Sequence, residues 1–314
     1  MHIFDGHCDV LLKHYYQRHF RNKQNFQISF QTLKEGGVKF QVCALYLPTP
    51  LRHSLDPIVD MYSLFLEILQ KEPSFHWVKN LSDLHLVQKN PEKIGLLLSL
   101  EGAEPLSNRL ERLDFFHHLS ITLITLTWSR RNDFADGTSF DPSMETSYGL
   151  TPLGRKLIQR MNQLSMVVDV SHLNERGFWD VLEISEKPVV ASHSCVHKLA
   201  PHTRNLKDDQ IRKLAEIHGL IGINFYPTFL TGSSQASVAD IVKHIQYISD
   251  LTGSTENIAL GSDFDGIETS PEDLSSPKYF DNLREALAKA GFSSEDQEKI
   301  LWKNWFRIFE SHLS

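Results

Sequence analysis

Six side chains that can bind a metal ion or carry a proton lie directly after short apolar runs of this 314-residue sequence. They are His7, Asp9, Glu101, His172, His193 and Asp263. In the run HCD, the two-residue period of an extended chain points His7 and Asp9 to one side and Cys8 to the other. Imidazole and carboxylate groups suit zinc and other first-row divalent ions. The spacing therefore predicts a metal site built from several separate segments.

Three histidines and two carboxylates are enough ligands for two closely spaced ions, with Glu101 as the bridge between them. Each ion would keep an open position for a shared water, and two cations lower the pKa of such a water until hydroxide forms near neutral pH. Asp263 could take the proton of this hydroxide and return it to a leaving amine. Glu101 and Asp263 are thus the predicted catalytic carboxylates of a hydrolase.

Each of these residues also has an ordinary explanation. A single histidine in a barrel is more often a hydrogen-bonded core or loop residue than a ligand. The glutamate after SL and the run DFDG could simply form turns. What favours a site is the coincidence, because five strand ends each deliver a metal-competent or acid-base side chain.

Apolar, β-branched runs alternate with stretches of helical periodicity along the chain, which predicts parallel strand and helix units. The expected strands cover residues 2–5, 38–47, 94–101, 119–128, 166–172, 188–194, 220–226 and 257–265, and the expected helices 56–71, 107–118, 151–164, 174–185, 207–218, 236–251, 281–290 and 294–311. Eight such units predict a (β/α)8 barrel, in which functional residues collect at the carboxyl ends of the strands. An open doubly wound sheet is the alternative. With no linker or repeat in the chain, residues 1–314 are interpreted as one domain closed by the helices of about 281–311.

The overall composition excludes some partners. A net charge of −7 gives no general attraction to nucleic acid or to an anionic membrane. Three cysteines cannot form a disulfide framework and suit a reducing compartment. No apolar run approaches the length of a membrane span or of a signal peptide, so we expect a cytoplasmic protein.

Seven short motifs then carry a resemblance to a known family. They are DGHCDVLL at 5–12, LSLEGAEPL at 98–106, LITLTW at 123–128, VDVSHL at 168–173, ASHS at 191–194, TRN at 203–205 and GSDFDG at 261–266. In this order they resemble the membrane (renal) dipeptidase family, peptidase family M19, in its bacterial branch. The family belongs to the amidohydrolase-like superfamily of metal-dependent hydrolases.

The resemblance implies a (β/α)8 barrel that cleaves free dipeptides, including some with a C-terminal D-residue, with two zinc ions. It implies that His7 and Asp9 bind one ion, that His172 and His193 bind the other, and that Glu101 bridges them. It further implies that Asp263 is the acid-base residue and that Arg204 holds the substrate carboxylate. A guanidinium offers a carboxylate two parallel donors, which makes that role physically sensible. Other divalent metals could replace zinc, and the resemblance suggests a homodimer.

One position departs from the family. Mammalian members have a substrate-binding histidine where this chain has Trp128, and an indole has one N–H donor but cannot become an imidazolium. Asn132 is a nearby alternative donor, and Tyr226 at the end of the seventh strand is a further candidate for substrate contact. The change puts substrate preference in question more than metal binding.

Two other functions fit the same residues. Lactonases, phosphotriesterases and metallonucleases use similar ligand sets on barrels. A catalytically silent barrel could instead keep the metal for structure or binding, and Trp128 is the feature that would favour it. Assays on dipeptides, a lactone and a phosphodiester distinguish these alternatives.

Overall fold

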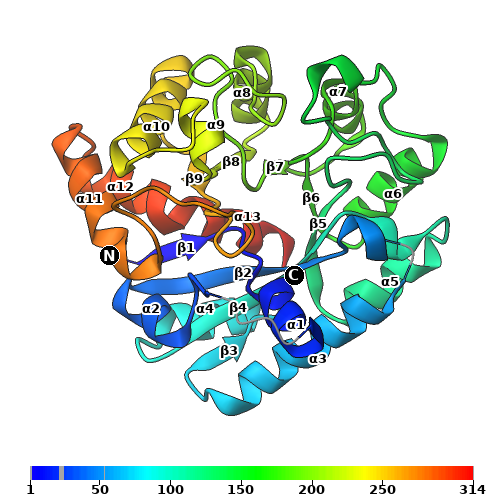
Figure 1. The fold of residues 1–314 in the computed structure, drawn as a ribbon, viewed down its shortest axis with the longest axis horizontal. Helices are drawn as coiled ribbons and strands as arrows, with labels where there is room; N and C mark the ends of the chain where they lie inside the picture. The colour runs from blue at the N-terminus through cyan, green and yellow to red at the C-terminus, as the bar shows by residue number, and fades with distance from the viewer. Residues whose placement is uncertain (1, 21–24, 53, 314) are drawn as a thin grey trace.

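The computed structural model describes residues 2–20, 25–52 and 54–313, and its centre is a closed ring of parallel strands (Figure 1). The predicted bounds of the domain, 1 and 314, lie outside the described residues. β1 pairs with both β2 and β9, and β2 pairs with β4, so that eight strands close the ring in the order β1-β2-β4-β5-β6-β7-β8-β9. The predicted (β/α)8 barrel is therefore confirmed. The strands are β1 (Ile3–Asp5), β2 (Val38–Tyr46), β3 (Phe75–Trp77), β4 (Ile94–Glu101), β5 (Ile121–Thr125), β6 (Val167–Asp169), β7 (Val190–Ala191), β8 (Leu220–Ile223) and β9 (Ile258–Leu260).

The strand β3 is an addition that the sequence pattern did not predict. It pairs with β4 from Ile94 to Leu96, before Leu98, where β5 begins to pair with β4. Its three residues are only half-buried, unlike those of the equally short β1, β6 and β9, so the sequence shows no buried apolar run there.

Most predicted strands are too long at their carboxyl ends. The run 166–172 ends its ladder at Asp169, and 257–265 ends at Leu260. Beyond these points His172, Asp263 and Asp265 have positive φ values of 64°, 62° and 70°, which no strand allows. The chain leaves the ladder where it must turn polar side chains toward the mouth of the barrel.

The helices surround the strands on the outside of the ring, as Figure 1 shows. Thr151 caps α6, because its Oγ1 accepts from the N–H of Gly154 at 3.0 Å. Four helices, α1, α2, α4 and α9, were not predicted, and α5 begins four residues later than expected. The helices are α1 (Val10–Phe20), α2 (Phe30–Glu35), α3 (Asp56–Lys71), α4 (Leu81–Lys89), α5 (Glu111–His118), α6 (Pro152–Gln163), α7 (Glu175–Ile184), α8 (Asp208–Glu216), α9 (Pro227–Thr231), α10 (Val238–Thr252), α11 (Phe280–Lys289), α12 (Ser294–Glu298) and α13 (Asn304–His312).

The last helical segment fills the barrel from below the site. The predicted helix 294–311 is α12, a π-helical turn at Lys299–Lys303, and α13. Trp305 of α13 donates its indole N–H to the carbonyl of Leu260 at 2.8 Å. It also lies so close to Gly6 that a Cβ there would approach its ring to 2.1 Å. Only glycine allows this contact just before His7.

Two apolar clusters separate the inside of the barrel from the outside. The inner one takes side chains from all eight barrel strands together with Trp305 and Phe309 of α13. The larger cluster packs the outward-facing strand residues against the helices. On β4 the inner residue is Leu97, so Glu101, four residues later, points to the same face, at the open end. None of the helices within the described ranges is long and apolar enough to span a bilayer.

Candidate metal centre and active site

His7 and Asp9 lie side by side just beyond β1. Their side chains approach to 3.4 Å between Nε2 and Oδ2, while Cys8 between them turns away and lies 4.0 Å from the sulfur of Cys43. Both ring nitrogens of His7 and Oδ1 of Asp9 are buried and lack a hydrogen-bond partner among the described residues. Buried polar atoms are almost always satisfied, so these three atoms fit a role as metal ligands.

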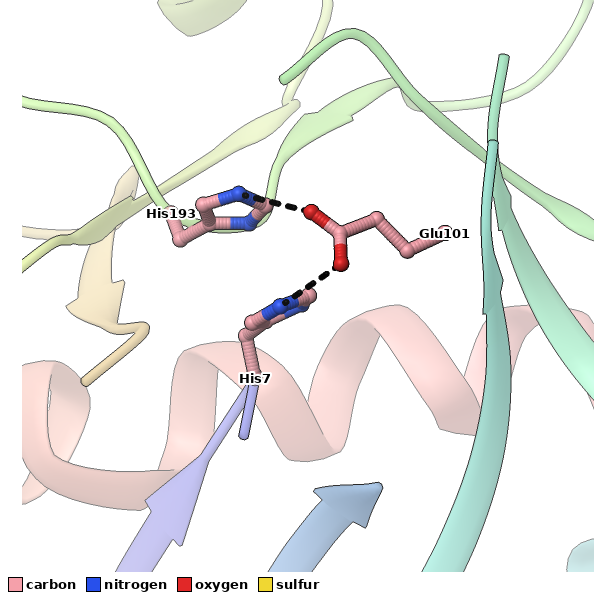
Figure 2. Close-up of side chains that lie close together, drawn as sticks. All are labelled: His7, Glu101 and His193. Carbon is pink, nitrogen blue, oxygen red and sulfur yellow. Dashed lines mark ion pairs between the residues drawn. The ribbon is translucent and has the colours of Figure 1, made fainter. Parts of the chain in front are cut away.

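Glu101 faces histidines with each of its two oxygens. Its Oε2 lies 3.7 Å from Nε2 of His7, and its Oε1 lies 3.1 Å from Nε2 of His172 and 3.7 Å from Nε2 of His193. Figure 2 shows the carboxylate between His7 and His193, with one oxygen directed to each ring. The two oxygens of one carboxylate therefore face different histidines, which is the arrangement a bridging ligand needs.

His172 and His193 present their Nε2 atoms to each other at 2.8 Å. Each ring orients its other nitrogen on a serine hydroxyl, His172 on Ser129 at 2.8 Å and His193 on Ser192 at 2.7 Å. Ring nitrogens held in this way by a second group are typical of metal-ligating histidines, because the partner sets the tautomer and the ring orientation.

A buried carboxylate lies behind one of these serines. Asp169 accepts hydrogen bonds from the hydroxyls of Ser192 and Thr125, each at 2.6 Å, and from two backbone N–H groups. An ionised carboxylate only accepts, so the Ser192 hydroxyl donates to Asp169 and accepts from Nδ1–H of His193. The lone pair of His193 is thereby left on Nε2, which faces Glu101.

Asp263 completes the cluster from the β9 side. Its Oδ1 lies 3.8 Å from Nε2 of His7, and its Oδ2 accepts from the amide of Asn224 at 2.9 Å. The preceding residue, Ser262, is tied to buried Asp5 of β1 through its backbone N–H at 2.8 Å. β1 and the β9 loop are thus held together, which places Asp263 opposite His7.

The charges of the site shift the pKa values in opposite directions. Burial, followed by the charge of Asp9, raises the pKa of Glu101 well above its usual value. Burial lowers the pKa of His7, but the charges of Glu101 and Asp9 outweigh it and raise it to about 10. Burial keeps the pKa of His172 far below its ordinary value, and the charges of Arg204 and His7 lower it further. The pKa of His193 is lowered in the same way, by burial first and then by the charges of His7 and Arg204. Two neutral imidazoles are what a divalent cation binds.

These observations fit a metal centre. Two sets of three ligand atoms each lie within 4.8 Å of one another, namely His7 with Glu101 and His193, and His7 with Asp9 and Asp263. Buried carboxylates at this density repel one another unless a cation lies between them. His172 and Asp263 also hold positive φ values of 64° and 62°, the kind of strain that gathers at functional sites.

A cavity of about 300 Å³ opens above the cluster. Its wall contains Asp9, Glu101, His172 and Asp263 at one end and mostly apolar or aromatic side chains elsewhere, which are Leu12, Tyr46, Trp128, Phe140, Tyr226, Phe229 and Ile267, with Gly266 and Glu268. Two predicted substrate contacts, Trp128 and Tyr226, are therefore on this wall. Trp128 stacks on the ring of His172 at 5.6 Å between centroids.

Arg204 is part of the wall of a second cavity, of about 210 Å³, and contacts the first cavity's wall through Phe229. Its guanidinium covers the ring of Phe229 at 5.5 Å, and it donates to the carbonyl of His193 at 3.0 Å and to Ser194 at 3.4 Å. Its Nε is buried without a partner among the described residues. Of the five N–H groups of an arginine, only two are engaged here by described residues, which leaves donors for a carboxylate.

Asn132 lies elsewhere. Its amide donates to the carbonyl of Leu126 at 2.8 Å, and its oxygen accepts from the N–H groups of Phe134 at 2.9 Å and Ala135 at 3.1 Å. The side chain closes a turn, and among the described residues it is not part of either cavity wall. The geometry therefore does not support the predicted role as a substrate donor.

Sequence reasoning overlooked several residues of the site. Tyr46 ends β2 and reaches the cavity wall, and Phe140 and Phe229 reach it from loops and from α9. The serines behind the histidines were also missed. Asp169 lies in the motif VDVSHL, three residues before His172, and Ser192 lies in ASHS, directly before His193, and this proximity was the available signal.

Comparison with known proteins agrees with this geometry. Residues 1–313 match the family model of membrane dipeptidase, peptidase family M19. A relative, dipeptidase aclJ of Aspergillus oryzae, is 29% identical over 98% of this chain and 77% of its own. The crystal structure of a metallo peptidase from Rhodobacter sphaeroides, liganded with a phosphinate mimic of the dipeptide L-Ala-D-Ala, has a TM-score of 0.92 at 26% identity and covers 99% of both chains. The crystal structure of the dipeptidase AC, a family M19 metallo peptidase, also has a TM-score of 0.92, at 28% identity over 100% of this chain and 99% of its own.

Proposed function

The chain belongs to the membrane dipeptidase family, peptidase family M19, a family of metallo-dipeptidases, and on this premise we propose that it hydrolyses free dipeptides with two divalent metal ions, zinc foremost. His7 and Asp9 would hold one ion, His172 and His193 the other, and Glu101 both. The observation that carries the proposal is the position of Glu101. One of its oxygens faces His7, and the other faces His172 and His193. Bound ions would supply Lewis acidity, which activates water and polarises the scissile carbonyl.

Asp263 is the proton carrier in this proposal. Asn224 holds its Oδ2, which leaves Oδ1 facing the centre of the cluster. Burial raises the pKa of Asp263 to about 7, against the opposing charge of His7, and bound cations would lower this value again. Oδ1 can take a proton from the attacking water and return it to the amide nitrogen, which leaves readily only when protonated.

Arg204 would bind the carboxylate of the dipeptide. It has N–H donors that no described residue engages, is only 4% exposed, and covers the ring of Phe229, which is part of the cavity wall. Burial lowers the pKa of Arg204, against the charges of Asp263 and Glu101, and a buried guanidinium with free donors favours an anionic ligand. Peptides without a carboxylate at that distance leave it unpaired, so longer chains are disfavoured.

The proposal is tested by removing and restoring the metal. Chelator-treated protein should release no amino acids from L-Ala-L-Ala or L-Ala-D-Ala, and addition of Zn²⁺ should restore release. The second substrate is included because the phosphinate in the Rhodobacter sphaeroides enzyme mimics it. Glu101→Gln should bind less metal and stay inactive at any zinc concentration. Protein that is fully loaded with metal and yet cleaves no dipeptide would overturn the proposal.

A further inference from the structure

Aromatic rings line the cavity as a connected series, which we call the aromatic arc. It consists of five wall residues, Tyr46, Trp128, Phe140, Phe229 and Tyr226, and of His202, which is not a described wall residue but connects Phe140 to Phe229. Successive ring centroids lie 5.6, 5.5, 5.8, 4.6 and 5.0 Å apart. Such spacings are those of favourable aromatic pairs. The rings of the arc therefore support one another and hold the shape of the wall.

The arc faces a cavity whose other half is acidic and polar. Asp9, Glu101 and Asp263 lie at the metal end, and Glu268 is exposed at the wall. A dipeptide whose reacting bond lies at the metal end has its side chains left to contact the rings. The wall thus offers apolar surface to a substrate side chain. It offers no cationic partner to an acidic substrate side chain, since none of the described wall residues of this cavity is a lysine or an arginine.

Trp128 is the second ring of the arc, and several neighbouring groups hold it in place. It stacks on His172 at an interplanar angle of 26° and meets Phe140 edge-on at 83°. The guanidinium of Arg130 lies 5.3 Å from its centroid. Arg130 is itself held by Glu104 at 2.7 Å and by the carbonyl of Leu47 at 2.7 Å. A ring immobilised before binding loses little entropy when a ligand packs on it.

We propose that the aromatic arc selects dipeptides with one bulky apolar side chain, aromatic ones foremost, and that Trp128 is the principal specificity determinant. The inference rests on the proposed dipeptidase function and adds the substrate class. Contact between a substrate ring and Trp128 replaces water on two apolar faces at once. Because each methylene in an apolar pocket changes kcat/KM by about 10-fold or more, a whole ring should give a preference of at least that size.

The test compares kcat/KM of the metal-loaded enzyme on five dipeptides: L-Ala-L-Ala, L-Ala-L-Phe, L-Phe-L-Ala, L-Ala-L-Lys and L-Ala-L-Asp. We expect one of the phenylalanine dipeptides to exceed L-Ala-L-Ala by about 10-fold or more, and L-Ala-L-Asp to be the poorest. Equal values for the alanine and phenylalanine substrates would overturn the inference. So would a lysine substrate that exceeds both, since Glu268 would then decide the preference.

Variants locate the preference. Trp128→Ala should reduce the ratio of phenylalanine to alanine turnover to near one, and Trp128→Phe should retain most of it. Because Trp128 touches a proposed metal ligand, bound metal is measured for each variant. Phe140→Ala alters the arc at a ring that is 48% exposed, and it should lower the same ratio at unchanged metal content. Phe115→Ala is the matched control, because this ring is 57% exposed on α5 and is not part of the cavity wall.

The two proposals fail in different ways. If no dipeptide is cleaved by metal-loaded protein, the proposed function is wrong. If L-Ala-L-Ala is cleaved but the ratio in Trp128→Ala and Phe140→Ala equals that in Phe115→Ala, the function stands and the aromatic arc is not a specificity device.

Discussion

Replacement of Asp169 by asparagine should weaken metal binding although Asp169 itself binds no metal in the proposed site. Asp169 accepts backbone N–H groups of Ser171 and Ser192 on Oδ1, at 3.0 and 2.8 Å, and hydroxyls of Ser192 and Thr125 on Oδ2. In Asp169→Asn the amide oxygen must continue to accept hydrogen bonds from the backbone N–H groups of Ser171 and Ser192, because an amide nitrogen cannot accept them. The amide nitrogen then faces the two hydroxyls and donates to them. The hydroxyl proton of Ser192 is turned toward His193.

This reversal changes the tautomer of His193. Its Nδ1 would accept from Ser192 at 2.7 Å, so its proton would move to Nε2, the atom that faces Glu101 and His172. A protonated Nε2 cannot bind a cation. Loss of such a supporting group typically costs about 10-fold to 100-fold in metal affinity. The free energy of unfolding should fall by about 1–3 kcal/mol, because the buried hydroxyls of Ser192 and Thr125 lose the carboxylate oxygen to which they donate.

The assay is titration of metal-free protein with Zn²⁺ against a competing chelator, with urea unfolding in parallel. Thr125→Val is the matched control. It removes another hydrogen bond to the same Oδ2, at 2.6 Å, and should lower stability without reversing the bond to His193. If Asp169→Asn binds both ions with wild-type affinity, or if Thr125→Val weakens binding equally, Asp169 does not set the tautomer.

Three further predictions concern the residues that face the substrate. Asp263→Asn should lower kcat by about 100-fold or more while bound metal stays at the wild-type level, and a wild-type kcat would exclude the role as proton carrier. In metal-free protein, folding raises the pKa of Asp263 from 3.8 to about 7, so its ionisation destabilises the fold as the pH rises through that window. As the pH rises through this range, the free energy of unfolding of Asp263→Asn should therefore increase relative to that of wild type, as measured in urea titrations. A constant difference between the two proteins would contradict the raised pKa. Arg204→Met should raise KM for free dipeptides and leave C-terminally amidated analogues unchanged, whereas an equal effect on both would reject the carboxylate role.

Much of this protein was predictable because its pattern is local. Hydrophobic periodicity is a property of neighbouring residues, and it predicted the eight barrel strands and helices such as α3 with its exact bounds. Parallel strands bring their carboxyl ends to one side, so the side chains of residues as distant as His7 and Asp263 could be expected to meet. The helices α2 and α9 were missed because six and five residues are too few to show a helical period, whereas α1 and α4, with 11 and 9 residues, were missed although they are long enough.

Only the tertiary structure decided how those side chains face one another. That Glu101 directs one oxygen to His7 and the other to His172 depends on the register of β4 between β2 and β5, which the order of residues does not state. The engagement of Asn132 in a turn, and the meeting of Trp128 with Phe140 and His172, arise from loops whose paths are set by packing. The types of residue and their periodicity are properties of the sequence. Distances between side chains depend on how separate segments pack, and these distances determine the chemistry of this site.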